Sequence, residues 1–259
     1  MPHKVARYGW LPDLSDQRDH MYAAPPPVLS ALPPSIDLTS KCPPVYDQGQ
    51  IGSCTANAIA GAIEFDRLKQ GLQDFVPSRL FIYYNERAME GTVNSDSGAM
   101  IRDGIKSVAT LGDCAEKLWP YDGSPFPPNP KLTQKPSQPC YAQALKYKAV
   151  QYQRMTQILN QLKGCLASGY PFVFGFTVYQ SFESNTVAQT GHASMPSPSE
   201  GVVGGHAVMA VGYDDAHQWF IVRNSWGNGW GMKGYFTLPY AYLTDHHLAN
   251  DFWTIRLVQ

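Results

Sequence analysis

The sequence of 259 residues has little charge and no excess of either sign. Lysine and arginine total 20, and aspartate and glutamate total 21, which gives a formal net charge of −1. A chain without a basic surplus has no global attraction to nucleic acid or to anionic membranes, so we expect neither as a partner. Only 16% of the residues are charged whereas 44% are hydrophobic, which excludes an intrinsically disordered protein.

Long apolar segments are also absent. The longest, residues 170–179, is far shorter than the roughly 18 residues of a membrane span and contains Pro171 and Gly175. The first thirty residues contain no apolar core of a secretory signal peptide. We therefore expect no membrane span, and either a cytoplasmic protein or one exported without a cleavable signal.

The motifs of metal and nucleotide sites are missing. The sequence has no His-Glu-x-x-His, no Cys-x-x-Cys and no Gly-x-x-x-x-Gly-Lys, and its 7 histidines show no zinc spacing. We therefore expect neither a metal nor a cofactor. Five cysteines are too few for a disulfide scaffold, and the odd number leaves at least one thiol unpaired within the chain.

The residues that are present divide the chain into three segments. Residues 1–34 show no helical or strand period and contain runs of proline, which predicts an extended N-terminal arm. Tyr8, Trp10 and Leu11 indicate that the arm docks, either along a cleft or behind the rest of the fold, and a frayed terminus is the alternative. The remaining segments are a helix-rich half, residues 35–145, and a strand-rich half, residues 146–259.

Hydrophobic periodicity, together with the positions of glycine and proline, predicts the helices and strands. Residues 54–70 are rich in alanine and end before Gly71, which predicts a helix with Cys54 in its first turn and Ser53 as its N-cap. Seven prolines between residues 120 and 140 exclude a helix or a central strand there and indicate a surface crossing. Further helices are predicted over 78–90, 99–111 and 158–168, and strands over 171–179, 206–213, 218–224, 234–238 and 252–258.

Four residues from distant parts of the chain form one chemical constellation. Cys54 begins a helix, where exposed N–H groups and the helix dipole lower the pKa of a thiol. His206 begins a strand and Asn224 ends another, so the Asn224 amide can fix the imidazole while its second nitrogen accepts the thiol proton. Gln48 can donate to an oxyanion beside the Cys54 backbone N–H. Reading Cys54 merely as a small buried residue leaves the other three unexplained.

The same residues lie in segments that resemble the motifs of the papain-like cysteine peptidases. Residues 47–54 are similar to the nucleophile motif, residues 205–213 to the histidine motif and residues 224–235 to the asparagine motif. Residues 34–38 resemble the usual start of the mature enzyme, and the resemblance covers residues 33–259. It implies an α+β, papain-like fold of two subdomains. The helical half holds the cysteine at a helix N-terminus, an antiparallel, β-barrel-like half holds the histidine and the asparagine, and a cleft separates them.

The resemblance also implies a role for each matching residue. Cys54 is the nucleophile, His206 the general base and then acid, and Asn224 the residue that orients the imidazole. Gln48 is the oxyanion donor. The implied protein is a monomeric cysteine endopeptidase that hydrolyses peptide or protein substrates through a thioester acyl-enzyme, with the arm as a short autoinhibitory prosegment. Its substrate-binding residues are Gly98, whose backbone pairs with the P2 residue, together with Gly205, Ala207 and Trp226, the last also shielding the imidazole from water.

Two departures from the family pattern stand next to the nucleophile. Ile51 replaces a cysteine of the family signature, so the disulfide that usually ties this loop is missing, and Thr55 replaces an aromatic residue. Thr55 changes the packing across the two halves but not the chemistry. Among the other cysteines, the sequence allows one disulfide within the set Cys42, Cys114 and Cys140, and it places Cys165 in the core of a helix.

Two other functions remain open at the level of sequence. An acyl or peptidyl transferase would use the same acyl-enzyme at Cys54 and resolve it with an amine instead of water. A catalytically silent peptide-binding homologue would keep the cleft with the arm filling it, although the intact residue set argues against this. Specificity is open as well: an acidic pocket floor near Ala249–Asp251 favours basic side chains, and an apolar floor favours bulky aliphatic ones.

Overall fold

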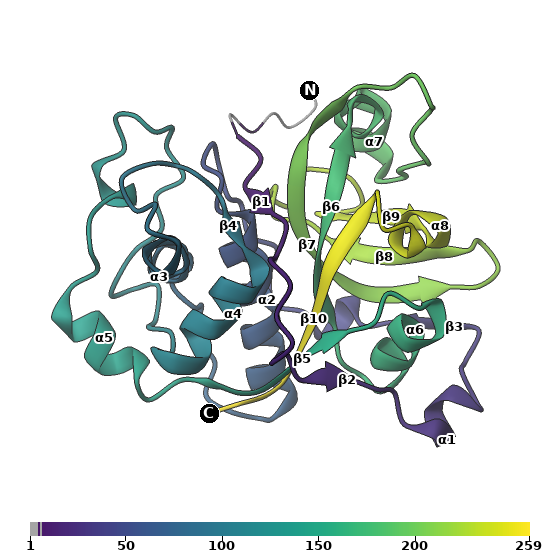
Figure 1. Ribbon diagram of the computed structural model, residues 1–259, viewed down its shortest axis with the longest axis horizontal. Coiled ribbons are helices and arrows are strands. Elements are labelled where there is room, and N and C mark those ends of the chain that lie inside the picture. The colour runs from purple at the N-terminus through teal and green to yellow at the C-terminus, as the bar shows by residue number, and fades with distance from the viewer. Residues whose placement is uncertain (1–4, 6) are drawn as a thin grey trace.

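The computed structural model describes residue 5 and residues 7–259 (Figure 1). The longest helices gather on one side of the molecule, the large sheet lies on the other together with several short helices, and the N-terminal segment runs along the line where the two sides meet. Residues 1–4 and 6 of the predicted arm lie outside the described residues. The rest of the arm forms two short strands and one turn of helix, namely β1 (Trp10–Leu11), β2 (Met21–Tyr22) and α1 (Pro26–Leu29).

The helical side is built around α2 (Cys54–Lys69), which matches the helix predicted over residues 54–70. All of its first fourteen residues are buried, because α2 packs against the other helices and against the large sheet. Its alanines and one glycine allow this close approach of backbones. Ser53 stands at the N-cap position as predicted, but its hydroxyl lies 2.5 Å from the Tyr121 hydroxyl and does not cap the helix backbone.

The other two predicted helices of this side are also present. Helix α3 (Arg79–Glu90) begins after Ser78, whose hydroxyl accepts a hydrogen bond from the Phe81 amide at 3.2 Å. Helix α4 (Ile101–Thr110) starts two residues later than predicted, because β4 (Ala99–Met100) pairs with the arm instead. Within the described part of the chain, no helix has both the length and the apolar character that crossing a membrane requires.

The opposite side is an eight-stranded sheet formed by β2 together with β3 (Ser35–Asp37), β5 (Ala149–Met155), β6 (Phe172–Tyr179), β7 (Val202–Asp214), β8 (Trp219–Arg223), β9 (Tyr235–Pro239) and β10 (Ala249–Val258). The strand order is β2-β5-β10-β6-β7-β8-β9, with β3 paired to β7. The implied barrel-like half is therefore corrected to an open sheet, whose end strands β2 and β9 do not pair. The arm supplies β2 and so covers one edge, with parallel pairing to β5.

Some elements were not predicted. Strand β5 contains several polar side chains that stay partly exposed, so the apolar pattern that would predict a strand is weak there. Helix α5 (Gln138–Ala144) extends into the proline-rich crossing of residues 120–140, because Pro139 fits in the first turn of a helix. The other helices are α6 (Leu159–Ala167), which was predicted, and α7 (Asn185–Thr190) and α8 (Tyr240–Thr244), which were not.

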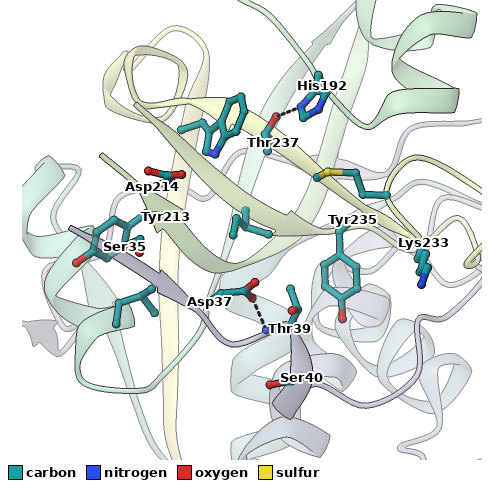
Figure 2. Close-up of a pocket in the computed structure, with 14 residues that line it drawn as sticks. Ser35, Asp37, Thr39, Ser40, His192, Tyr213, Asp214, Lys233, Tyr235 and Thr237 are labelled. Atoms are coloured by element: carbon teal, nitrogen blue, oxygen red, sulfur yellow. Dashed lines mark hydrogen bonds between the residues drawn. The ribbon is translucent and has the colours of Figure 1, made fainter. Parts of the chain in front are cut away.

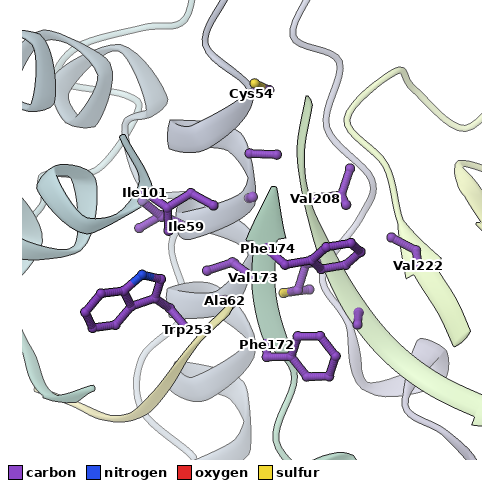
Figure 3. Packing of buried hydrophobic residues seen from close by; sticks show 14 of the residues in the cluster. Cys54, Ile59, Ala62, Ile101, Phe172, Val173, Phe174, Val208, Val222 and Trp253 are labelled. Carbon is purple, nitrogen blue, oxygen red and sulfur yellow. The ribbon is translucent and has the colours of Figure 1, made fainter. Parts of the chain in front are cut away.

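The core lies between α2 and the sheet. Figure 3 shows Cys54 at the end of α2, with Ile59 further along the helix and Val173 and Phe174 on the strand that faces it. All five cysteines are free thiols, so the disulfide that the sequence allows within Cys42, Cys114 and Cys140 is not formed. Cys42 instead donates to the Leu38 carbonyl, the thiols of Cys114 and Cys140 hydrogen-bond to each other, and Cys165 is buried as predicted.

Candidate active site

Three segments of the chain meet at the sulfur of Cys54. Cys54 is the first residue of α2 and its exposed fraction is 0%. The sulfur receives hydrogen bonds from the backbone N–H groups of Thr55 in α2, Ala207 in β7 and Gly9 in the N-terminal arm. Because Ala207 follows His206 directly, the histidine motif lies against the nucleophile motif although more than a hundred residues separate them in the sequence.

His206 and Asn224 form a buried pair. The imidazole Nε2 of His206 lies 2.8 Å from Oδ1 of Asn224, and both residues are buried. The same Asn224 oxygen accepts the backbone N–H of Ser225 at 2.8 Å, which fixes the direction of the amide. The indole of Trp226 stacks on the imidazole with 5.0 Å between ring centroids and 24° between planes. The ring of His206 is therefore held at one nitrogen and covered on one face.

Gln48 is fixed at both ends of its side-chain amide. Its Oε1 accepts a hydrogen bond from the Ser225 hydroxyl at 2.6 Å, and its Nε2 donates to the Ile51 carbonyl at 3.0 Å. The Gln48 backbone N–H also donates to the Ser225 carbonyl at 2.8 Å. Ser225, which was not among the predicted site residues, thus ties the Gln48 loop to the segment after Asn224. The interaction needs only a hydroxyl, which carries no distinctive sequence signal.

The thiol of Cys54 differs from the sequence expectation. A helix N-terminus and a neighbouring imidazole predict a lowered pKa. In the structure, burial raises the pKa of the Cys54 thiol from its ordinary value near 9 to about 12, and the backbone N–H groups of Ala207 and Gly9 offset only part of this effect. Removing water from a sulfur penalises the charged thiolate, so the closed structure holds a neutral thiol.

The arm causes this burial because it passes directly over the site. The ring of Tyr8 meets His206 edge-on at 5.8 Å and lies 6.3 Å from Trp226, and its hydroxyl hydrogen-bonds to the Glu183 carboxylate. Gly9 comes so close to the nucleophile loop that a Cβ on it would stand 1.7 Å from the Gly52 carbonyl oxygen. Only a residue without a side chain fits at this crossing.

Besides Trp226, two glycines among the predicted substrate-binding residues contact the arm. Gly98 has φ +75°, a conformation that favours glycine, and a Cβ there would lie 2.2 Å from the Gly9 carbonyl oxygen. The next residue, Ala99, donates its N–H to that oxygen at 2.8 Å, and β1 pairs with β4 in parallel. On the opposite wall, Gly205 lies against the indole of Trp10. The arm therefore occupies the positions at which a substrate backbone and side chain are expected.

A cluster of ion pairs holds the continuation of the arm, and the sequence did not predict it. Asp19 forms a bidentate pair with Arg102, at 3.0 and 2.5 Å, and lies 3.3 Å from Arg154. Asp13 accepts the Arg102 backbone N–H at 3.0 Å and the Trp253 indole N–H at 2.9 Å. These contacts join residues more than eighty positions apart, which single-sequence reasoning cannot pair.

The two departures beside the nucleophile have noncovalent substitutes. The Gly52 N–H donates to both carboxylate oxygens of Asp96 at 3.0 Å, and Asp96 also accepts the Tyr83 hydroxyl at 2.5 Å. Tyr83 in turn accepts the Gly98 N–H at 3.1 Å. This chain ties the loop before Cys54 to the Gly98 segment. Thr55 donates its hydroxyl to the Glu86 carboxylate at 2.6 Å, so a buried polar contact replaces the family's aromatic packing.

A separate pocket of about 650 Å³ lies on the sheet side of the molecule (Figure 2). Residues of β3, β7, β8 and β9 line it, and His192 and Lys233 stand at its rim. The residues that line it include none of the predicted site residues, so this pocket is not part of the Cys54 site.

Comparisons with known proteins agree with this geometry. Residues 32–251 match the papain family cysteine proteases. The chain is 50% identical to the solved structure of xylellain, a cysteine protease from Xylella fastidiosa, with a TM-score of 0.93 over 100% of this chain and 98% of that one. It also superposes on procathepsin B S9 from Trypanosoma congolense with a TM-score of 0.73 at 20% identity, over 90% and 80% of the two chains, which shows a shared fold.

Relatives in sequence point to the same group. An uncharacterized peptidase C1-like protein of Acanthamoeba polyphaga mimivirus is 47% identical over 82% of this chain and 69% of its own length. Bovine pro-cathepsin H is 28% identical over 80% of this chain and 59% of its own length. The chain thus spans roughly two thirds of the length of these curated relatives. From the matched domain and these similarities, we conclude that the chain belongs to the papain family of cysteine proteases.

Proposed function

We propose that this cysteine peptidase uses Cys54 as nucleophile, His206 as general base and acid, and Asn224 to orient the imidazole. The observation that carries this proposal is the meeting of the Ala207 amide with the Cys54 sulfur, beside a His206 ring held by Asn224 at 2.8 Å. The two ring nitrogens of His206 then have different roles, since a ring fixed at Nε2 exchanges a proton through Nδ1.

In the proposed reaction, His206 takes the thiol proton and the sulfur of Cys54 attacks the carbonyl carbon of the scissile peptide bond. The carbonyl electrons move to its oxygen, which the Cys54 backbone N–H and the Gln48 side-chain N–H stabilise. When the carbonyl re-forms, the C–N bond breaks, the leaving amine takes the proton from His206, and a thioester remains. Water then attacks the thioester with His206 as base, and the C–S bond breaks to give a carboxylic acid and the free thiol.

We also propose that the arm, residues 1–34, holds the described chain in an inhibited form. A substrate carbonyl needs the space that Gly9 fills, and burial removes the water that stabilises a thiolate. Cys54 is completely covered while Tyr8, Gly9 and Trp10 stay in place. Departure of the arm removes the cause of the raised thiol pKa and lets the ion pair with His206 form.

The path of the arm favours an endopeptidase. The arm crosses Cys54 at Gly9 and continues on both sides, toward Tyr8 at His206 and toward Trp10, which pairs with Ala99. A groove that accepts a continuous chain on both sides of the nucleophile suits cleavage within a polypeptide. We further propose that the chain acts as a monomer, and that its helix-rich half, residues 35–145, and strand-rich half, residues 146–259, meet at this groove. Light scattering of the purified chain tests the monomer.

The test of the nucleophile compares two cysteines in the full-length chain that also carries Trp10→Ala, which loosens the arm so that inhibition does not hide the activity. Cys54→Ala abolishes cleavage of an internally quenched peptide and labelling by a peptidyl epoxide, whereas Cys42→Ala, which removes a half-buried thiol elsewhere, retains both. Mass spectrometry of the products distinguishes cleavage inside the peptide from trimming of its ends. Equal activity of the two variants contradicts the assignment of Cys54. A ligated product with an added amine acceptor reports the transferase alternative, which the comparisons do not favour.

A further inference from the structure

Within the described residues, every hydrogen bond that the Arg102 side chain makes goes to the N-terminal arm. Its Nε and Nη2 donate to the two carboxylate oxygens of Asp19 at 3.0 and 2.5 Å, and its Nη1 donates to the Leu14 carbonyl. The Arg102 side chain is only 5% exposed while these bonds are in place. When the arm leaves, this guanidinium fork loses all three acceptors, and a carboxylate is the group that matches its two parallel N–H donors.

A second arginine reaches the same carboxylate from the sheet. Nη1 of Arg154, in β5, lies 3.3 Å from Asp19 Oδ2, the oxygen that Nη2 of Arg102 also contacts. The ring of Trp253 lies 5.7 Å from the guanidinium of Arg102 and 5.6 Å from that of Arg154. We call Arg102, Arg154 and Trp253 the carboxylate clamp. Because two like charges converge on one point, the clamp favours an anion between them.

The charges that remain after the arm departs leave this region positive. Arg154 keeps its ion pair with Asp251 at 2.9 Å. Arg102 loses the carboxylates of the arm, and the neighbouring Asp103 carboxylate feels the charge of Lys106 as well as that of Arg102. Three cations then stand against two carboxylates. An acidic group is therefore attracted to the clamp, whereas a basic one is repelled.

The clamp lies within reach of a chain that passes through the reaction centre. The Gly9 amide donates to the Cys54 sulfur, and Asp13, four residues further along the arm, accepts the Arg102 backbone N–H at 3.0 Å. Four extended residues span about 14 Å at most. Between these points the arm passes Gly98, which the family resemblance assigns to P2. A substrate on the same path therefore reaches the clamp with residues that precede its scissile bond.

We propose that the carboxylate clamp is an exosite of the peptidase, which binds the side chain of an aspartate or glutamate about four to six residues before the scissile bond of the substrate. Asp19 fills the clamp in the inhibited form, and an acidic residue of the substrate takes its place when the arm leaves. This inference rests on the proposed function of the Cys54 site and of the arm.

The first test examines the clamp without catalysis. In the full-length chain, Asp19→Ala empties the clamp, and the rate of Cys54 alkylation by iodoacetamide reports how often the arm opens. Acetate, which replaces the missing carboxylate, is expected to slow alkylation by about fivefold, whereas the neutral acetamide at equal ionic strength is not. Adding Arg102→Gln abolishes the effect of acetate, and adding Lys117→Gln, at an exposed lysine of the loop after α4, preserves it. No effect of acetate, or an effect that survives Arg102→Gln, overturns the inference.

The second test uses substrates. The full-length chain carrying Trp10→Ala and Asp19→Asn, which loosen the arm at the cleft and at the clamp, cleaves peptides with one aspartate placed in turn at P3 to P8. Each peptide is compared with its asparagine counterpart. At one position between P4 and P6 we expect kcat/KM for aspartate to be higher by about tenfold, through a lower KM, because the clamp is remote from the reacting atoms. This comparison stands even if Asp19→Ala fails to fold.

The controls separate the exosite from the peptidase itself. Adding Arg102→Gln brings the ratio of aspartate to asparagine peptides to about one, and adding Lys117→Gln leaves it unchanged. A ratio near one at every position, or a tenfold ratio that survives Arg102→Gln, overturns the inference while the peptidase assignment stands. Loss of cleavage for every peptide, together with no epoxide labelling of Cys54, contradicts the proposed function, and the acetate measurement still decides whether the clamp binds a carboxylate.

Discussion

Two neighbouring parts of the N-terminal arm are held in different ways. The cleft segment, residues 8–11, lies over the reaction centre and is held by aromatic packing against glycines and by backbone pairing with β4. The anchor segment, residues 13–19, lies beyond the groove and is held by carboxylates against Arg102 and Arg154. Different residues therefore cover Cys54 and anchor the arm, so docking of the arm can be weakened without a change at Cys54.

The largest effect is expected in the cleft segment. Trp10→Ala in the full-length chain removes a buried side chain, and such truncations cost about 3–5 kcal/mol. We expect the rate of Cys54 alkylation by iodoacetamide, followed by peptide mapping, to rise by on the order of 10²-fold, since the arm opens more often. Cys114, buried beside Cys140 and Ser78 on the helical side, serves as the internal control. A parallel rise at Cys114 indicates general unfolding and contradicts the assigned role.

The anchor segment gives the next largest effect. Asp19→Asn keeps the size of the side chain but removes its charge from the nearly buried pair with Arg102. Breaking such a pair is strongly destabilising because Arg102 stays buried without its counter-charge, and we expect alkylation of Cys54 to rise by about tenfold. The same measurement on Ser15→Ala, within the segment but outside these ion pairs, gives the baseline. Equal rates for both variants would remove the distinction between the two segments.

A pH effect of smaller size separates the segments further. Burial, reinforced by the neighbouring Asp251 carboxylate, raises the pKa of Asp13 from its ordinary value near 4 to about 6. The docked arm therefore holds this proton more tightly than the released arm does. Docking strengthens as the pH falls from about 7 toward 4, and it weakens as the pH rises through about 6. The ratio of Cys54 alkylation in the parent chain to that in Asp13→Asn, which cancels the ionisation of the thiol itself, is expected to be lower at pH 5 than at pH 7. A ratio that rises on acidification contradicts this sign.

The smallest effect is expected at the surface of the anchor. Lys106 lies 3.3 Å from Asp16, and both side chains reach solvent. Exposed pairs of this kind contribute little, so Lys106→Ala is expected to change Cys54 alkylation by less than about twofold. Repeating the assay at about 1 M salt, where the screening length is about 3 Å, sharpens the contrast, because the exposed Lys106–Asp16 pair is screened whereas the nearly buried Arg102–Asp19 pair is screened much less. A large effect of Lys106→Ala would show that the surface pair, and not Arg102, holds the segment.

The residues proposed for the reaction centre could be selected from the sequence because each carries a local signal. Cys54 stands at the start of an alanine-rich helix, and Asn224 and His206 lie at strand positions within recognisable motifs. The family, the mixed helix and sheet content and the main helices were predicted for the same reason. Strand β5 was not predicted, because half-exposed polar side chains hide its alternating apolar pattern. Helix α5 was not predicted, because Pro139 lies in a proline-rich run that is typical of a loop.

The closed state depends on contacts that carry no local signal. Asp19 and Arg102 are ordinary surface-type residues in sequence, and only the fold brings them together. The raised pKa of Cys54 has the same origin, since it depends on Gly9 arriving from a distant segment. The sequence motifs predict the thiol pKa of an uncovered site, whereas in the structure the arm covers the sulfur. That difference accounts for the wrong direction of the predicted thiol pKa.

The covered sulfur has a consequence for how long the protein keeps its capacity to react. Peroxide oxidises thiolates that solvent can reach, first to sulfenic acid and then to products that are not reduced again. Under Gly9, Cys54 is neutral and out of contact with solvent, so this chemistry lacks both of its requirements. In the inhibited form proposed above, the arm thus preserves the nucleophile as well as restraining it, and its departure would expose the sulfur to oxidation.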